Sequence, residues 1–229
     1  MSLHLGHAPQ IKDLISGAFS RALERTKLEN GGLYTGAFIL CATNAYDQSS
    51  KHLNHVELLR HMFVGERIGA KLTKATSLRN VYALFHEFPL IGDFMAYQLA
   101  IDVNYTELVD FDEDEFTQPG PGALRGIQKA FTDLGGMSPS EVILWMTERQ
   151  EEEFTRLGLM FGGLWGRRLH AIDCQNLFCE FDKYCRVAVP ELASNRTRIK
   201  SRFVPSPEPI SYFFPPKWGL NEKIDLKSK

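Results

Sequence analysis

The sequence predicts an all-α protein, and three observations support this fold class. Residues 9–29 place their apolar side chains on one helical face, and Gly31-Gly32 ends that period. The sequence Ser138-Pro139-Ser140-Glu141 is a capping box with proline at the first helical position, a pattern typical of a helix start. The apolar run 34–46 is long and rich in alanine, which favours a buried helix over a strand.

The expected helices follow one another as far as residue 190. Besides 9–29 and 34–46, they begin near residue 54, after a Ser77 cap, near residue 93, at Ser138 and near residue 169. Beyond Pro190 the sequence becomes basic and then rich in proline and aromatic residues. We therefore predict a helical domain at 1–190 and a C-terminal extension at 191–229 that packs on it.

The composition is that of an ordinary soluble domain. The chain has 229 residues, 44% of them hydrophobic and 24% charged, and its formal charge is −2. It therefore has no global basic field, and a nucleic-acid partner would need local basic patches. The four cysteines form no C-x-x-C pair, so we expect free thiols, no metal and no cofactor. No signal or membrane span is evident, which predicts a cytoplasmic location away from membranes and leaves the oligomeric state open.

Two glycine turns, each followed by an expected helix, are candidates for contact with phosphate. Glycines in such a hairpin let the backbone approach a phosphate, and the N-terminus of the next helix binds the anion. The first turn contains Gly92, although Leu90 stands where the pattern has its first glycine. The second contains Gly120 and Gly122, with Arg125 in the first helical turn. Either one alone could be an ordinary turn between helices.

Three motifs carry a resemblance to a known family. They are PLIGDFMAYQLAIDVNY, PGPGALRGIQKAF and DCQNLFCEFDKYCRV. Together they resemble the alpha-glutamyl/putrescinyl thymine pyrophosphorylases, also called DNA base hypermodification proteins, over about residues 32–190. The helical domain of that family also occurs in the kinase for hydroxymethyluracil in DNA and is similar to helix-hairpin-helix DNA glycosylases. The resemblance implies two helical lobes with a cleft between them, and DNA with modified pyrimidines as partner. Because the chain has no Walker-type glycine-lysine loop, we do not expect it to be the kinase.

Base excision requires a carboxylate near the sugar, where positive charge develops as the glycosidic bond breaks. Asp102 is one candidate, because it lies on the helix after the first hairpin between apolar residues. Asp182 is its rival, because D-K-Y-C-R-V resembles the aspartate helix of glycosylases. The acidic run 110–115 is expected to be a solvated loop, and the sequence does not decide between Asp102 and Asp182.

Glu180 and Lys183 share a helical face with spacing that suits either a buried polar network or a surface ion-pair ladder. We expect them to shape the catalytic pocket. Side chains that could contact an extruded base are Asn104, Tyr105, Gln98, Gln175 and Tyr184. Cations that could contact phosphates, besides Arg125, are Arg167, Arg168, Arg196, Arg198, Lys200 and Arg202.

These features favour a monofunctional DNA glycosylase that flips out and excises a hypermodified pyrimidine from phage DNA, leaving an abasic site, as antiviral defence. A lyase would have a lysine where Phe94 stands, so we expect hydrolysis without an attacking amine. The alternative is a transferase in which an amine or amino acid displaces pyrophosphate from an activated thymine methyl group. In that reaction Lys183, Arg186 and Arg125 would hold the pyrophosphate. A third possibility is a DNA-binding module without chemistry.

Overall fold

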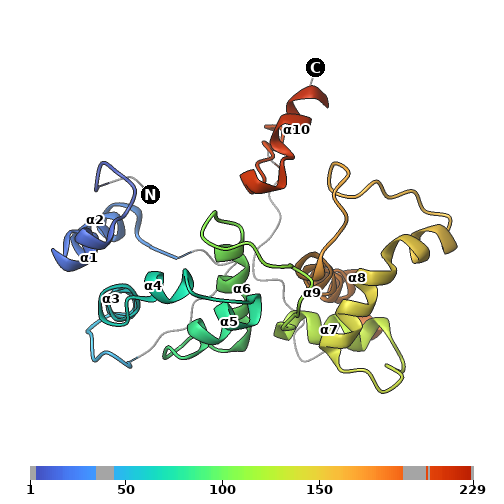
Figure 1. Ribbon diagram of the computed structural model, residues 1–229, viewed down its shortest axis with the longest axis horizontal. Helices are drawn as coiled ribbons and strands as arrows, with labels where there is room; N and C mark the ends of the chain where they lie inside the picture. The colour runs from blue at the N-terminus through green and yellow to red at the C-terminus, as the bar shows by residue number, and fades with distance from the viewer. Residues whose placement is uncertain (1–3, 35–43, 193–204, 206, 228–229) are drawn as a thin grey trace. The chain divides into compact units, whose positions relative to one another are not determined.

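The computed structural model describes residues 4–34, 44–192, 205 and 207–227, and all its named elements there are helices (Figure 1). An isolated bridge between Leu164 and Arg167 accompanies them. The predicted all-α class is confirmed, whereas the glycosylase-like arrangement of two lobes around a cleft stays a prediction. Of the helices described, none is long and apolar enough to cross a membrane.

The chain divides into two compact units, Met1–Ala75 with Ala83–Gly92 and Thr76–Tyr82 with Asp93–Lys229. The first contains α1 (Ile11–Ile15), α2 (Ala18–Asn30), α3 (Lys51–Arg60), the π-helix η1 (His61–Gly65) and α4 (Ile68–Leu72). The expected helix 9–29 is split because Gly17 has φ +72°. Most of the expected helix 34–46 lies outside the described residues.

The helix α5 (Leu78–His86) spans the division between the units, and its start was predicted correctly. Ser77 accepts the Asn80 N–H at 3.0 Å, as an N-cap residue does. Glu115, far along the chain, accepts the N–H groups of Leu78 at 2.7 Å and Arg79 at 3.2 Å. The N-terminus of α5 is therefore held by a local hydroxyl and by a distant carboxylate.

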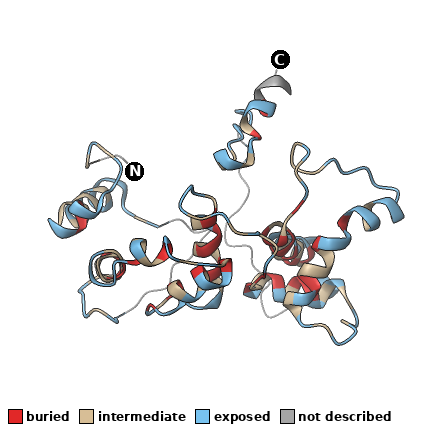
Figure 2. Ribbon diagram, viewed as in Figure 1, coloured by how far each residue is buried: buried red, intermediate tan, exposed pale blue. Residues whose placement is uncertain are grey.

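The second unit contains α6 (Asp93–Asn104), α7 (Pro121–Ala130), α8 (Pro139–Arg156) and α9 (Ala171–Ala188). Three short elements follow, namely η2 (Pro190–Leu192), η3 (Pro216–Trp218) and α10 (Asn221–Lys227). Apolar residues of α7, α8 and α9 form one core cluster, which includes Ala123, Ile127, Val142, Ile143, Cys174 and Phe178. Figure 2 shows buried residues along α6, α7 and α9. These helices provide the frame for the site described below.

The predicted capping box of α8 is confirmed. Ser138 Oγ accepts the Glu141 N–H at 3.3 Å, and Glu141 Oε2 accepts the Ser138 N–H at 2.7 Å. We expect Ser138→Ala to lower the free energy of unfolding by about 1 kcal/mol, because the Glu141 N–H loses the hydroxyl oxygen that accepts its hydrogen bond. Chemical denaturation measures this, with Ser140→Ala in the first turn of the same helix as the control. Equal stability of the two variants would contradict the assignment.

The acidic run 110–115 lies in a loop, as expected, and Asp110 and Asp112 are exposed there, but its last three carboxylates have partners distant in the chain. Glu113 forms a 2.8 Å ion pair with Arg167, and both side chains are nearly buried. Asp114 accepts the Ala171 N–H at 2.8 Å and lies 3.2 Å from His170 Nδ1, at the N-terminus of α9. With Glu115 at α5, three consecutive carboxylates hold two helix starts and a buried arginine. The run is therefore a structural junction.

The C-terminal aromatic segment packs on the second unit. Lys217 Nζ lies 2.8 Å from Asp110 Oδ1, and the Trp218 ring lies edge-on to Tyr105 with centroids 5.1 Å apart. The Arg167 guanidinium lies 3.7 Å from the centroid of the same Trp218 ring. These contacts agree with an extension that packs on the helices, whereas the domain division at residue 190 stays a prediction.

Candidate functional site

The helices α7 and α9 lie side by side (Figure 1), and two glycines of α7 set their close approach. Gly122 and Gly126 are one helical turn apart and face α9. A Cβ atom at Gly126 would overlap the Phe178 carbonyl oxygen, and one at Gly122 would overlap the Cys179 sulfur. Only glycine allows this backbone separation, which lets short salt bridges form between the two helices.

The buried carboxylate of Asp182 on α9 is the centre of a cationic cluster. Arg125 Nε lies 3.1 Å from its Oδ2, and Lys129 Nζ lies 2.8 Å from its Oδ1. Arg186, one turn further along α9, also donates to Oδ2. Lys129 makes a second, longer bond of 3.4 Å to the Asp182 carbonyl oxygen. We call Arg125, Lys129, Arg186 and Asp182 the Asp182 cluster.

The cluster keeps Asp182 ionised. Burial acts to raise the pKa of its carboxyl group, but the hydrogen bonds from Lys129, Arg186 and Arg125 outweigh burial, and the pKa is lowered from its usual value. The side chain is 0% exposed, and its two oxygens already accept from three cations. This geometry gives Asp182 a role in positioning cations. It does not support the direct contact with substrate that the sequence suggested.

The other predicted catalytic residues of α9 lie on its exposed side. Glu180 and Lys183 form an ion pair within the helix, with side chains 64% and 43% exposed. Tyr184 is also exposed. Of the two interpretations left open by the sequence, the surface ion pair describes Glu180 and Lys183. Such pairs contribute little to stability.

The second hairpin has a packing role in this structure. The Gly120 N–H, which we expected to bind phosphate, donates to Gln175 Oε1 at 3.2 Å in a buried bond. The amide nitrogen of Gln175 donates to Asn176 at 2.8 Å, so both ends of this predicted base-reading side chain have protein partners. A Cβ atom at Gly120 would lie 2.7 Å from the Phe94 ring. Phosphate binding at Gly120 and Gly122 stays a prediction.

The first hairpin explains the departure noted at Leu90. Leu90 has φ +72°, in the left-handed region. The backbone at this position therefore has the conformation that glycine adopts without strain, as the hairpin pattern expects. Gly92 is exposed, and a Cβ atom there would meet nothing within 4 Å. Asp93, the first residue of α6, accepts from the Tyr82 hydroxyl at 3.1 Å. A carboxylate at this helix start competes with phosphate for the same positive end.

The predicted residues on and after α6 lie in three different surroundings. Asp102 is exposed, although partial desolvation raises the pKa of its carboxyl group. Asn104 is fully buried and makes two bonds to the Phe111 backbone, at 2.9 and 3.0 Å, which fix the intervening loop. Tyr105 packs on Trp218, and burial raises the pKa of its hydroxyl. In the described part of the chain, no hydrogen bond or ion pair joins Asp102 to the Asp182 cluster.

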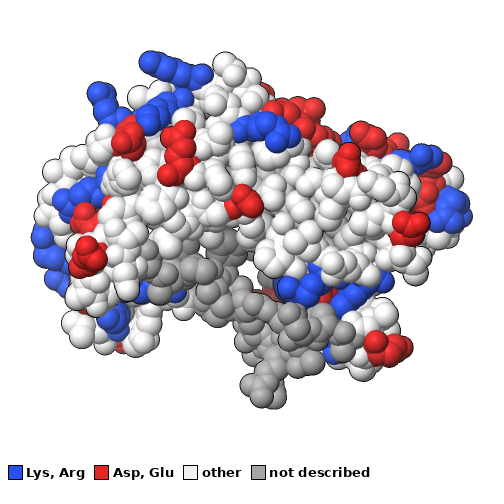
Figure 3. All heavy atoms as spheres, turned by 90° about the horizontal axis from the view of Figure 1, so that it is seen from below, with Lys and Arg blue, Asp and Glu red and all other residues white. Residues whose placement is uncertain are grey.

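The predicted phosphate-binding cations are mostly occupied or outside the described residues. Arg167 lies between Glu113 and Asp173, at 2.8 and 3.4 Å. Arg168 donates to the Thr147 carbonyl oxygen at 2.6 Å and remains exposed. Arg196, Arg198, Lys200 and Arg202 lie outside the described residues. On the face shown in Figure 3, acidic and basic side chains are interspersed.

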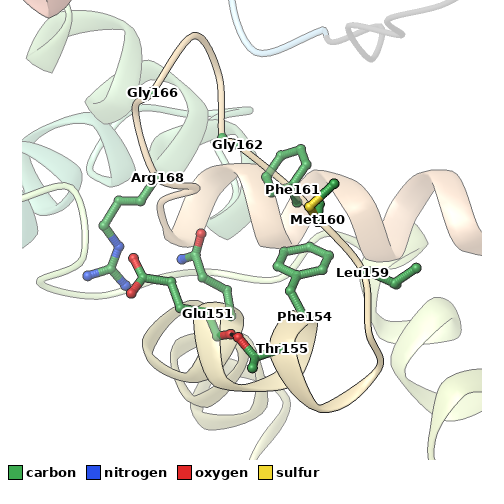
Figure 4. Close-up of a pocket in the computed structure, with 11 residues that line it drawn as sticks. Glu151, Phe154, Thr155, Leu159, Met160, Phe161, Gly162, Gly166 and Arg168 are labelled. Carbon is green, nitrogen blue, oxygen red and sulfur yellow. Dashed lines mark hydrogen bonds between the residues drawn. The ribbon is translucent and has the colours of Figure 1, made fainter.

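A pocket of about 510 Å³ lies between the end of α8 and the glycine-rich turn before α9 (Figure 4). The Phe154 and Phe161 rings, 4.9 Å apart, form one side of it together with the exposed Met160. Arg168 and Glu151 lie on the other side in Figure 4. This pocket was not predicted, because its walls meet only after the turn folds back on α8.

Two kinds of residue were missed by reasoning from sequence. Lys129 is four positions after Arg125, so it shares a helical face with it, and extending the α7 period would have found it. The partners of Glu113, Asp114 and Glu115 lie 54, 57 and 37 positions away in the chain. No local signal identifies pairs at that separation.

Comparisons with known proteins place this all-helical chain among the proteins of DNA base modification. Residues 1–194 match the family model described as "5-hmdU DNA kinase, helical domain", so the chain belongs to that family. It is 26% identical over 180 residues to the 5-hmdU DNA kinase of Bacillus phage SP10. That alignment covers 72% of this chain and 28% of the relative, so the chain spans under a third of it. No solved structure matches.

This family overturns the predicted excision activity. A kinase transfers a phosphoryl group, so a hydrolytic glycosylase that flips out a base and leaves an abasic site is the wrong enzyme class. The transferase alternative is closer, although it also differs, and the pyrophosphorylase identity is not supported. Our exclusion of the kinase on the missing Walker-type loop was also wrong for the family. The loop is absent from these 229 residues, but the family model that they match describes a helical domain, so its absence does not exclude the family.

Proposed function

We propose that this chain is a helical domain that serves the phosphorylation of 5-hydroxymethyl-2′-deoxyuridine in DNA. The observation that carries the proposal is the family match over residues 1–194. In the reaction, the hydroxymethyl oxygen forms a bond to the terminal phosphorus of a nucleoside triphosphate. The bond from that phosphorus to the leaving diphosphate breaks, and the hydroxyl proton passes to a base.

Phosphoryl transfer depends on positioning and on stabilising charge, so the acceptor strand must be held in a fixed place. The 229 residues contain no Walker-type loop to hold a triphosphate. We therefore assign to this chain the binding of DNA and the presentation of the modified base. We also propose that the chain has a helix-hairpin-helix fold with a DNA-binding cleft. Its substrate would be phage DNA in the cytoplasm of the host. The relative's phage origin supports the latter.

The proposal predicts a preference for DNA that contains the hydroxymethyl group. We expect the chain to bind an oligonucleotide with 5-hydroxymethyluracil at least about fivefold more tightly than the same oligonucleotide with thymine, because one further hydrogen bond contributes about 1 kcal/mol. Fluorescence anisotropy at fixed salt measures both affinities. Single- and double-stranded forms are tested in parallel.

Two results would contradict the proposal. One is equal affinity for the thymine and the hydroxymethyluracil oligonucleotides. The other is the appearance of alkali-labile sites in the modified DNA after incubation, since these report excision. A second arm adds a nucleoside triphosphate with Mg²⁺ and follows the mass of the base, because phosphorylation adds a phosphate group to it while excision removes the base.

A further inference from the structure

We propose that the pocket between α8 and the glycine-rich turn binds a guanine base, with the attached sugar and phosphate outside in solvent. Its volume of about 510 Å³ is within the range of sites that hold small organic ligands. The pocket has an aromatic side and a polar side, and each suits a different part of such a base (Figure 4).

The aromatic side of the pocket is suited to stacking. The rings of Phe154 on α8 and Phe161 on the turn have centroids 4.9 Å apart and planes inclined by 37°. Phe161 is 44% exposed and the neighbouring Met160 is fully exposed, so apolar surface here faces solvent. Exposed apolar surface marks binding sites, and the face of a phenyl ring stacks well on a flat heteroaromatic ring.

The polar side offers one hydrogen-bond donor group and one acceptor group. Arg168 Nη2 donates to the Thr147 carbonyl oxygen at 2.6 Å, which fixes the position of the guanidinium. Within the described parts of the chain, the Nε and Nη1 atoms of Arg168 make no hydrogen bond, and the Glu151 carboxylate accepts none. Both side chains lie on the same side of the pocket in Figure 4. Their remaining hydrogen-bonding capacity is therefore available to a ligand.

The charges of the lining favour a neutral ring over an ion. One carboxylate and one guanidinium line the pocket, so its formal charge is zero. A ligand that donates to the carboxylate and accepts from the guanidinium satisfies both groups. Guanine does so with several atoms, since N1–H and the 2-amino group donate, and O6 and N7 accept. Adenine, cytosine and thymine each offer a carboxylate the N–H groups of only one nitrogen.

The walls of the pocket are held in place by bonds within the chain. Gln150 donates to the Leu169 carbonyl oxygen at 2.8 Å and accepts the Leu169 N–H at 2.9 Å, which joins α8 to the end of the turn. Within the turn, Leu164 and Arg167 exchange two backbone bonds of 2.7 and 3.0 Å. Gly163, with φ +70°, allows this reversal, because a Cβ atom there would lie 2.3 Å from the Arg167 carbonyl oxygen. Walls that are already ordered lose little entropy when a ligand binds.

A guanine base of this kind has two sources. One is a free guanine nucleotide, and the other is an unpaired guanine in a single strand of DNA. The base makes the same contacts in both cases. The inference rests on the pocket alone and goes beyond the proposed function.

The site is tested by titrating the full chain with guanosine monophosphate at constant ionic strength, using calorimetry. We expect saturable binding that Glu151→Gln weakens at least about tenfold, since the base loses a charge-assisted pair of bonds. Glu152→Gln is the matched control, because Glu152 is the next residue, is also exposed and pairs with Arg149. This control variant should bind the nucleotide as the unchanged chain does.

Stacking is tested with Phe161→Ala, which should weaken binding at least about fivefold. Its control is Phe213→Ala, because Phe213 is an exposed phenylalanine that does not line the pocket. If Phe161→Ala does not fold, the pair of glutamate variants decides. Equal weakening by Glu151→Gln and Glu152→Gln would overturn the assignment to this pocket.

The identity of the base is tested with two further nucleotides. Inosine monophosphate lacks the 2-amino group and should bind about fivefold more weakly, since one hydrogen bond is lost. Adenosine monophosphate should bind at least about tenfold more weakly. Equal affinity for the guanine and adenine nucleotides overturns the proposal, and so does the absence of saturable binding. If only the apolar dye 8-anilinonaphthalene-1-sulfonate binds, and Phe161→Ala abolishes its binding, the pocket is an apolar docking face and the proposal is wrong.

The source of the base is identified by competition against guanosine monophosphate. The competitors are a single-stranded oligonucleotide with one guanine and the same strand with hypoxanthine in its place. Stronger competition by the guanine strand identifies DNA as the source, and no competition by either identifies the free nucleotide. Equal competition by both strands contradicts recognition of the 2-amino group. No ligand here contains a hydroxymethyl base, so the outcome is independent of the test of the proposed function.

Discussion

Replacing Gly126 with alanine is expected to lower the free energy of unfolding by about 3 kcal/mol or more. The added Cβ atom would overlap the Phe178 carbonyl oxygen, a backbone atom that can move only if α9 moves with it. Separating α7 from α9 would loosen the core cluster that contains Ile127 and Phe178. It would also lengthen the salt bridges of the Asp182 cluster. Overpacking of a well-filled core typically costs 1–3 kcal/mol, and here the loss of these bridges adds to it.

The measurement is chemical denaturation of the Gly126→Ala chain beside a matched glycine variant. Gly69 lies within α4, and a Cβ atom there would meet nothing within 4 Å. Gly69→Ala should therefore leave the free energy of unfolding unchanged or raise it by up to about 1 kcal/mol, since alanine favours helix. If both variants were equally stable, the close contact of α7 with α9 would not be an essential part of the fold.

Much of the helical frame could be predicted because its signals are local. The capping box at Ser138 and the cap at Ser77 lie within four residues of the helix starts that they define. A glycine, in contrast, can either bind phosphate in a hairpin or allow two helices to pack closely, and the sequence does not distinguish these roles. Gly120 and Gly122 fit a phosphate-binding hairpin by spacing, yet in the structure Gly122 faces the Cys179 side chain of α9, and Gly126, one turn on, faces the Phe178 backbone. Which role a glycine of α7 has depends on the position of α9, which is distant in the sequence.

The acidic run shows the same limit for charges. A run of carboxylates is most often solvated, and this was the expectation for 110–115. Glu113, Asp114 and Glu115 instead find a buried arginine and two helix starts, all distant in the chain. The chemistry of the family was missed for a related reason. The recognised motifs belong to helices that different enzymes share, so they identified the helical domain and did not identify the reaction.

Asp182→Asn is expected to lower the free energy of unfolding by about 3–5 kcal/mol, because it removes a buried carboxylate that pairs with Arg125, Lys129 and Arg186. Glu180→Gln on the same helix removes a carboxylate from an exposed pair and should cost no more than about 1 kcal/mol. Lys129→Met should cost less than Asp182→Asn, because Asp182 keeps both arginines. If Lys129→Met cost more, Asp182 would not be the centre of the cluster.

The stability difference between the unchanged chain and Asp182→Asn should also become smaller as the pH falls. The pKa of Asp182 in the folded chain is lowered from its usual value of 3.8. The ionised carboxylate therefore contributes its full stability above that usual value, and the contribution is lost as the pH falls through the folded pKa. Denaturation should give a constant difference above about pH 5 and a shrinking one below about pH 4. Protonation removes the charge of Asp182 but leaves its packing in place. If the stability difference stayed constant down to about pH 2, the asparagine variant would be destabilised by lost packing and not by lost charge.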